Sequence, residues 1–388
     1  MRRINEHNKK ILHSNNNLNK YLRAENLLKL DGVRFIAALA VFLWHFKLAF
    51  LNNSSKLNNI AIDILWSGGV GVDVLFVLSG FLIFLTLDNL YSRSHTGKLR
   101  IFYLKRILRI VPLYYFSIFI LTALFQPQLF SSLSSIRIII AHLFFFHIFN
   151  FEWVYAINGV YWTLSHEFLY YAVAPLLFFV VKKGYIYGLI IISFSLSIGY
   201  RYLIFKFLLP HISSAEFKFF YLEQFVARID QFVIGISIYW IIKNFKNEQE
   251  SKWMNFLLFS TWFISFMFIL LYPVYMSQDY FKDINTVLFW HPLLGISVGL
   301  FILLLLTTIS GKVTFLFANP LVHYLSKISY SIFIWHSPII GYVESLNFPL
   351  RISFLLCIIG TFILSTLSFY LVESPFLVVK DRISNIPY

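Results

Sequence analysis

The sequence has few charged residues and almost no cysteine. Charged side chains make up 13% of its 388 residues, whereas an ordinary soluble protein carries roughly 25%. Hydrophobic residues make up 59%, and so few charges cannot cover that much apolar surface in water, which excludes a soluble enzyme, a coiled coil and a disordered chain. The single cysteine, Cys357, excludes a disulfide framework and a cysteine-based metal site within one chain.

Apolar and aromatic residues are abundant, with 45 phenylalanines and 23 tyrosines. They gather in stretches of about 17–23 residues, each long enough to cross roughly 30 Å of hydrocarbon as a helix. We therefore predict an all-α polytopic membrane protein with about ten transmembrane helices. A shorter run, 137–150, is predicted to be a re-entrant or interfacial helix. The predicted spans lie near residues 32–51, 68–88, 110–127, 161–181, 185–205, 225–242, 254–273, 287–309, 328–344 and 350–372.

Lysine and arginine set the predicted orientation. A net charge of +14 suggests nucleic acid in a soluble protein, but in a membrane protein basic residues collect on cytoplasmic loops, so no nucleic-acid partner is expected. With ten spans, most of these residues fall on the side of the basic N-terminal segment. We predict a bacterial inner-membrane protein with both termini cytoplasmic. Residues 1–29 are expected to form a flexible basic tail, 30–377 the membrane domain, and 378–388 a short cytoplasmic tail.

Two ionisable residues share one face of the first span. Arg34 and His45 are eleven residues apart, which is three helical turns plus about 20°, or about 16 Å along the axis. Arg34 is then at the inner interface and His45 near mid-membrane, which suits a ligand with an anionic part and a reactive part. The plainer alternatives are interfacial anchoring for Arg34 and a carbonyl-bonded histidine for His45.

Two carboxylates are predicted at the outer side. Asp73 begins the second span and is expected to orient the imidazole of His45, unless it only stabilises the start of its own helix. Glu167 stands near Trp162 and Tyr171 and is expected to bind a hydroxyl-rich acceptor or to serve proton transfer, with a helix-start role as its alternative. The consecutive Ser-His-Glu at 165–167 is no catalytic relay, because adjacent helical residues point about 100° apart.

A basic cluster precedes the third span. Three cations on about one helical turn are expected to bind the phosphates of a nucleotide-like ligand, and lipid head-group anchoring is the alternative. These cations are Lys105, Arg106 and Arg109. Among the histidines of the spans, His336 is explained as well by packing as by a site role. His142 and His147 lack metal-ligand spacing on one helix face, so no metal site is predicted.

Six sequence blocks, in order, resemble those of the membrane acyltransferase-3 family of bacterial O-acyltransferases. They lie between about residues 29 and 377. Phe168 stands where this family usually has a second acidic residue, and Phe333 where tyrosine is common. Some members carry a C-terminal SGNH-type hydrolase domain, and none is expected after residue 377. The blocks read LDGVRFIAALAVFLWHF, GVGVDVLFVLSGFLI, FYLKRILRIVPLYY, YWTLSHEFLYY, ISYSIFIWHSPI and SFYLVESPF.

The resemblance implies transfer of an acyl group, commonly acetyl, from a cytoplasmic acyl-CoA to a hydroxyl of a surface polysaccharide or glycolipid. O-antigen, capsule and exopolysaccharide are examples of such acceptors. His45 is expected to be the general base, assisted by Asp73 or Glu167. The phosphates of acetyl-CoA, or of another acyl-CoA, are expected at Arg34, Lys105, Arg106 and Arg109, and the acceptor at Trp162, Tyr171 and His336.

Two other functions are compatible with the same residues. A proton-coupled transporter or flippase would use the histidine and carboxylates as a proton relay, but would need no nucleotide-binding cluster. An assembly subunit that has lost the chemistry is the second alternative, and the intact Arg34–His45 pair argues against it. The identity of the acceptor, the acyl chain length and the oligomeric state are not predicted.

Overall fold

The computed structural model describes residues 24–51, 68–92, 97–244, 252–276, 280–307, 317 and 319–385. Every regular element within these residues is a helix, and eight helices are long and apolar enough to cross a membrane. This confirms an all-α polytopic membrane protein. In chain order, the helices at the ten predicted spans are α2 (Ala24–Phe50), α4 (Val70–Ser92), α5 (Lys98–Phe125), α8 (Tyr161–Lys182), α9 (Ile186–Leu203), α11 (Phe225–Asn244), α12 (Lys252–Met276), α13 (Ile284–Thr307), α16 (Ser329–Ser345) and α17 (Leu350–Ser368).

Both predicted tails overlap helices. Helix α2 begins at Ala24, six residues before the predicted boundary, and buried Lys29 donates to the carbonyl of Leu305 at the end of α13. Residues 1–23 of the predicted N-terminal tail lie outside the described residues. At the other end, the predicted tail is helical to Asn385. The remaining helices are short: α6 (Leu133–Leu143), α7 (Phe151–Val154), α10 (Ala215–Leu222), α15 (Pro320–Lys327) and α18 (Ser374–Asn385).

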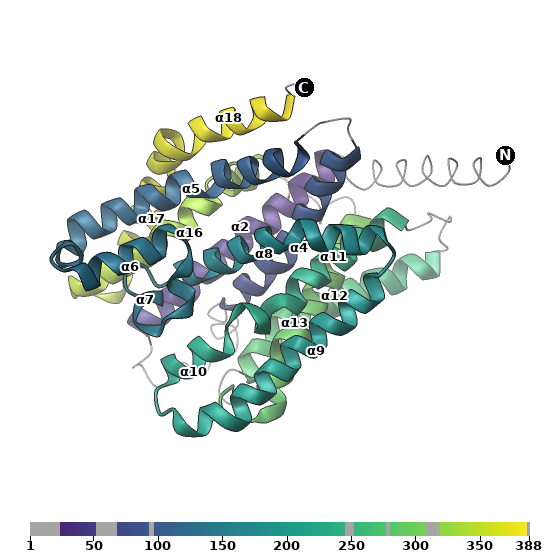
Figure 1. The fold of residues 1–388 in the computed structure, drawn as a ribbon, viewed down its shortest axis with the longest axis horizontal. Helices are drawn as coiled ribbons and strands as arrows, with labels where there is room; N and C mark the ends of the chain where they lie inside the picture. Colours follow the sequence, from purple (N-terminus) through teal and green to yellow (C-terminus); the bar gives the residue numbers. More distant parts are fainter. Residues whose placement is uncertain are drawn as a thin grey trace.

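Helices α4 and α11 form the centre of the bundle (Figure 1) and run parallel to each other. Three contacts between them share one register, in which each partner lies 155 residues further along the chain. Because the contacts are spaced by seven and eight residues, all three fall on one face of each helix. The contacts are Asp73 with Arg228, Gly80 with Gly235, and Asp88 with Lys243.

The parallel register decides how often the intervening chain crosses the membrane. Two parallel spans require an odd number of crossings between them, and α5, α8 and α9 supply three. A further crossing by α6 would make α4 and α11 antiparallel. Helix α6 has eleven residues, about 16 Å, which is half the thickness of the hydrocarbon core. The segment 137–150 therefore does not cross, as predicted.

Glycines allow the central helices to approach closely. A Cβ added to Gly80 of α4 would lie 2.1 Å from the carbonyl oxygen of Phe232, and one on Gly235 of α11 would lie 2.1 Å from that of Val77. Helix α2 crosses α4 in the same way, since a Cβ on Gly71 would lie 2.3 Å from the carbonyl oxygen of Ala37. Lipid tails are as apolar as the helix surfaces, so the hydrophobic effect does not drive helices together inside a bilayer. Close backbone contact is therefore a main source of packing energy.

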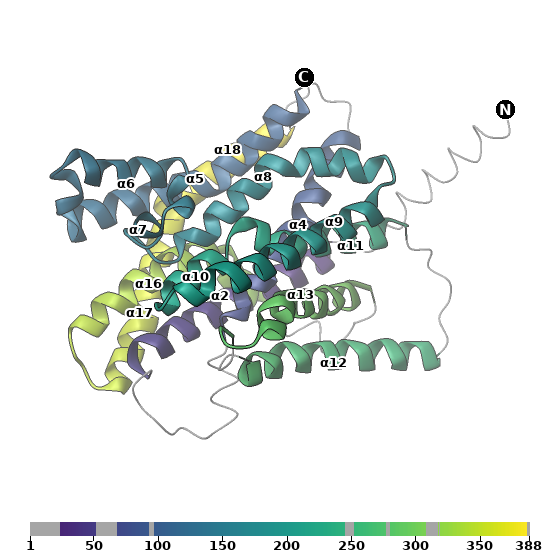
Figure 2. The same cartoon turned by 60° about the horizontal axis from the view of Figure 1, so that its bottom comes forward.

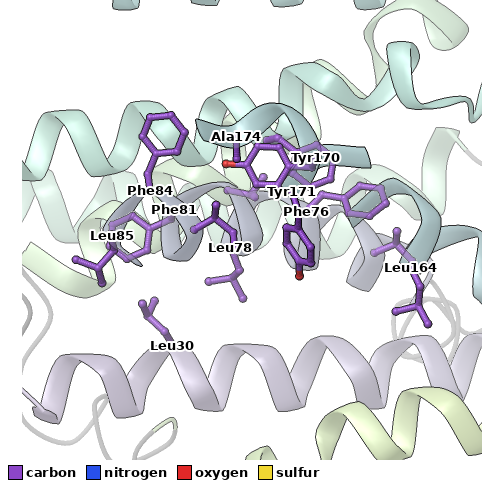
Figure 3. Close-up of a cluster of buried hydrophobic side chains, with 14 of the residues drawn as sticks. Leu30, Phe76, Leu78, Phe81, Phe84, Leu85, Leu164, Tyr170, Tyr171 and Ala174 are labelled. Carbon is purple, nitrogen blue, oxygen red and sulfur yellow. The ribbon is translucent and has the colours of Figure 1, made fainter. Parts of the chain in front are cut away.

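Large apolar side chains fill the space around the central crossing. Figure 3 shows this cluster, in which Phe76 of α4 lies near Tyr170 and Tyr171 of α8. Phe81 lies further along α4, beside Leu85, with Leu30 of α2 nearby. The periphery is different. Helices α9 and α17 expose most of their apolar surface, and α12 lies at the edge of the bundle against α13 (Figure 2). These outer helices present the surface that lipid covers.

Substitution of Gly80 tests the central crossing. We expect Gly80→Ala to lower the free energy of unfolding by about 1–3 kcal/mol, because α4 and α11 must separate to admit the methyl group. Tryptophan fluorescence during thermal unfolding in detergent measures the change. Gly199→Ala on α9 is the matched control, because its Cβ meets open space. Equal stability of the two variants would contradict the packing described here.

Candidate active site

A basic cavity of about 780 Å³ opens at the end of the bundle where α2 and α5 begin. It brings together the four residues predicted to bind phosphates, which come from two separate sequence blocks. Two further lysines, from α15 and α18, were not predicted. The cavity is lined by six lysines and arginines and two aspartates: Arg34, Lys105, Arg106, Arg109, Lys327 and Lys380, with Asp31 and Asp381.

The three arginines of this basic cavity are held in place by neighbouring side chains. Glu373, which binds Arg109, is itself buried and accepts a hydrogen bond from Ser331 of α16 at 3.0 Å. Fixed guanidinium groups lose little entropy when a phosphate binds. Their partners are Asp31 for Arg34 (2.8 Å), Glu373 for Arg109 (3.0 Å) and the hydroxyl of Thr86 for Arg106 (3.0 Å).

A narrow inner pocket of about 140 Å³ continues from the basic cavity into the bundle. Arg34, Arg106 and Arg109 line both spaces and therefore mark the junction between them. Beyond the junction the walls are mostly apolar and come from α2, α4, α8 and α16. Figure 3 shows the ring of Tyr171 directed from α8 toward α2, at one wall of this pocket.

Glu167 is the carboxylate of the inner pocket. It accepts hydrogen bonds from the hydroxyls of Ser79, at 2.6 Å, and Tyr171, at 2.9 Å. Both donors are neutral hydroxyls, and Arg106 lines the same pocket. Of the residues predicted to contact an acceptor, Tyr171 thus binds Glu167 and shares its pocket.

His45 forms a pair with His336, because α2 and α16 pack side by side. The Nδ1 atom of His45 lies 3.2 Å from Nε2 of His336, and the ring centroids are 4.9 Å apart. Phe333 lines the inner pocket, and its ring centroid is 5.7 Å from that of His336. The histidine pair therefore lies next to the end of the pocket formed by Phe333. His336, which was predicted to contact the acceptor, contacts the predicted base.

Hydrogen bonds define the tautomers of this histidine pair. Nδ1 of His336 lies 3.1 Å from the carbonyl oxygen of Ile332, and since a carbonyl only accepts, Nδ1 carries the proton. Nε2 of His336 then has a lone pair directed at His45. Nδ1 of His45 lies between this lone pair and the carbonyl oxygen of Val41, at 2.9 Å, and must also be protonated. The lone pair of His45 is therefore on Nε2.

Asp73 does not sit where the sequence suggested. Its carboxylate contacts Arg228 and His291, each at 2.7 Å, and Gln231, rather than the imidazole of His45. The reason is the parallel register of α4 and α11, which places Arg228 opposite Asp73. The expected orientation of His45 by Asp73 is thus corrected, and His336 occupies that position.

A second carboxylate completes this buried ion cluster, which consists of Asp73, Glu223, Arg228 and His291. Glu223, just before α11, binds Arg228 at 2.5 Å and Nε2 of His291 at 3.1 Å, and Tyr280 donates to it at 2.6 Å. Burial raises the pKa of Glu223, but Arg228 and His291 outweigh it and hold this pKa well below its usual range. The cluster ties α4, α11 and α13 together.

The side chains from Trp162 to Glu167 contact several different neighbours. Trp162 packs edge-on against Phe219, with ring centroids 5.7 Å apart, and is not among the described residues that line the two cavities. Ser165 contacts His147, at 3.1 Å, and His166 contacts the carbonyl oxygen of Glu223, at 2.7 Å. With Glu167 bonded to Ser79, the three consecutive residues face three different partners, as the helical geometry predicted.

His142 and His147 stack face to face, with ring centroids 4.1 Å apart. They lie at the end of α6 and just after it, and both are buried. In the described part of the chain, no group of three or more histidine, cysteine, aspartate or glutamate side chains is arranged to hold a metal ion.

The sequence carried a signal for three buried ionisable residues that the prediction missed. Arg228, His291 and Glu373 are ionisable residues within apolar segments, where a charge is costly unless it has a partner. That rule identifies them as important without naming their partners. Lys380 gives no such signal, because a cation just after the last span is ordinary.

Residues 27–370 match the sequence profile of the family described as an acyltransferase domain, which is more than half of the chain. The chain belongs to the acyltransferase-3 family. This confirms the resemblance of the six sequence blocks. No solved structure is similar to this chain.

Curated relatives in this family are longer than the chain. It is 25% identical to a "Putative O-acetyltransferase" of Staphylococcus aureus (strain COL), over 92% of this chain and 58% of the relative. It is 22% identical to "Peptidoglycan O-acetyltransferase OatA" of Listeria monocytogenes, over 89% of this chain and 55% of the relative. The chain thus spans a little over half the length of the relatives it matches.

Removal of one charge tests the buried ion cluster. We expect Glu223→Gln to lower the free energy of unfolding at pH 7 by about 3–5 kcal/mol, because Arg228 loses a buried partner. The depressed pKa of Glu223 means that its stabilisation is present above the usual pKa of glutamate and is lost as the pH falls through the folded value. The difference in stability between variant and wild type should therefore narrow as thermal unfolding is measured from pH 7 down to pH 3.

Glu216→Gln is the control for this experiment, because Glu216 is an exposed carboxylate on the neighbouring helix α10. We expect it to unfold like wild type at every pH. A Glu223 variant that matches this control at pH 7 would show that the cluster does not stabilise the fold.

Proposed function

We propose that this protein is an O-acetyltransferase that moves an acetyl group from acetyl-CoA to a hydroxyl of a cell-surface glycan. The observation that carries the proposal is the arrangement of three features along one line. A cavity with six cations leads into a narrow apolar pocket, and Phe333 at the wall of that pocket separates it from the histidine pair, in which Nε2 of His45 has a lone pair. Family membership and the names of the relatives support the same activity.

The basic cavity is the proposed donor site on the cytoplasmic side. The phosphates of the donor bind the cations, and the pantetheine arm enters the inner pocket past Arg34, Arg106 and Arg109. The apolar walls keep water from the thioester, which limits hydrolysis. The cations of the bundle support this orientation, because most of them lie at the end that carries the basic cavity.

His45 is the proposed general base. Its Nε2 takes the proton of the acceptor hydroxyl as the oxygen attacks the thioester carbonyl, and the bond from carbonyl carbon to sulfur breaks. The imidazolium then gives this proton to the leaving thiolate, so that ester and free CoA are the products. His336 stabilises the proton on Nδ1 throughout. Glu167 is proposed to help position the reacting groups from the inner pocket.

The acceptor is proposed to be a sugar hydroxyl of the cell envelope. Relatives named as peptidoglycan O-acetyltransferases favour a cell-wall glycan, and lipopolysaccharide, capsule and exopolysaccharide offer the same chemistry. Trp162 lies at the outer side, near the short helices α7 and α10, where an aromatic ring suits stacking on a sugar. A panel of purified glycans with acetyl-CoA identifies the acceptor by mass spectrometry.

Loss of His45 tests the proposed base. We expect His45→Ala to lower the rate of acetyl transfer by about 10²–10⁴-fold. The KM for acetyl-CoA should change little, because Arg34, the cation of the basic cavity that shares α2 with His45, lies about 16 Å from it along the helix. Purified protein in nanodiscs, acetyl-CoA and a cell-wall fraction are the assay components. His211→Ala, an exposed histidine outside the site, should retain full activity.

Two outcomes would contradict this proposal. A fully active His45→Ala would remove the base from the mechanism while leaving the activity in place. A wild-type protein that neither binds nor consumes any acyl-CoA, across a panel of chain lengths and acceptors, would favour the transporter instead. Proton-coupled flux in vesicles would then be the next measurement.

His336 is proposed as a positioning residue, and substitutions that keep or remove its acceptor atom test this role. We expect His336→Phe to lower kcat about tenfold, since one hydrogen bond to a reacting group is worth about 1 kcal/mol, with an unchanged KM for acetyl-CoA. His336→Gln restores an acceptor for Nδ1 of His45 and should recover most of kcat. Equal losses in both variants, or a raised KM in either, would mean that His336 only supports packing.

A further inference from the structure

The cations of the basic cavity form two groups that lie at different depths. Three arginines line both the cavity and the inner pocket, whereas three lysines line the cavity alone. These lysines come from three helices around the opening, α5, α15 and α18. The outer group is Lys105, Lys327 and Lys380.

The two groups differ in charge and in chemistry. At the junction, Arg34 and Arg109 bind Asp31 and Glu373, and Arg106 shares the inner pocket with Glu167, so three carboxylates accompany the three arginines. The outer part of the cavity is lined by the three lysines and Asp381. Guanidinium groups suit bidentate contact with a diphosphate, while ammonium groups act as point charges.

The covalent order of CoA matches this division. The diphosphate is joined directly to the pantetheine arm, so an arm in the inner pocket places it at the junction arginines. The ribose lies beyond the diphosphate and carries a 3′-phosphomonoester, with a charge of about −1.5 to −2 at pH 7. The 3′-phosphate would therefore lie in the outer part of the cavity.

We propose that Lys105, Lys327 and Lys380 form a phosphomonoester subsite that recognises the 3′-phosphate of the CoA donor. This inference rests on the proposed function. The subsite lets the protein select CoA thioesters over acyl donors that lack this phosphate, such as 3′-dephospho-CoA or an acyl group on a protein-bound phosphopantetheine arm. It also gives α18 a role, since the end of the chain supplies Lys380.

Binding of CoA and of 3′-dephospho-CoA to the full chain tests this subsite. Nanodiscs of zwitterionic lipid and titration calorimetry suit the measurement. We expect wild type to bind CoA at least tenfold more tightly, because charged hydrogen bonds are the stronger class. Lys327→Ala and Lys380→Ala should each weaken CoA binding about three- to tenfold and change 3′-dephospho-CoA binding less than twofold.

Arg382→Ala is the matched control, because Arg382 is an exposed cation on the same helix as Lys380 and is not among the described residues that line the cavity. It should leave both affinities unchanged. Equal affinity of wild type for the two ligands, or equal weakening of both by the lysine variants, would overturn the subsite while leaving the donor proposal intact. Failure of both ligands to bind wild type would instead overturn the proposed function.

A phosphomonoester is also present in an anionic lipid head group, so the source of the ligand needs its own comparison. Nanodiscs with phosphatidic acid should leave the preference for CoA in place. If this lipid abolishes the preference and stabilises wild type but not the lysine variants against heat, the subsite belongs to the head group, and the proposal fails.

Discussion

A charge inside a water-free bundle is stable only with a partner, and this constraint organises the central helices. Asp73 and Asp88 fix α4 to α11 at two levels, and the contact of Gly80 with Gly235 lies between them. Helix α4 therefore has one position relative to α11. The inner pocket and the basic cavity depend on that position, because α4 also supplies Ser79 for Glu167 and Thr86 for Arg106.

The second organising contact is the parallel packing of α2 on α16. It joins residues 291 positions apart in the sequence, and it places His336 beside His45. Because Arg34 and His45 share one face of α2, the same helix reaches the basic cavity at one end and the histidine pair further in. Phe333 separates the pair from the inner pocket. An acyl group at this end would meet the base only after passing an apolar ring, which keeps water out.

Composition and helical periodicity predicted the spans, the short α6 and the common face of Arg34 and His45, because these are local properties of the chain. The partners of charged residues were less accessible. Asp73 was assigned to His45 because a carboxylate can hold one tautomer of an imidazole, but the choice between His45 and Arg228 depends on how α4 packs on α11. Lys327 and Lys380 reach the basic cavity through short helices whose placement no local pattern encodes.

The two early carboxylates show how environment assigns a role. Asp73 is buried in contact with Arg228, His291 and Gln231, so its oxygens are engaged within the fold. Glu167 receives only the neutral hydroxyls of Ser79 and Tyr171, and it faces a pocket that arginines connect to the basic cavity. Of these two carboxylates, Glu167 lines the inner pocket together with Arg106, whereas Asp73 is not among the described residues that line the two cavities.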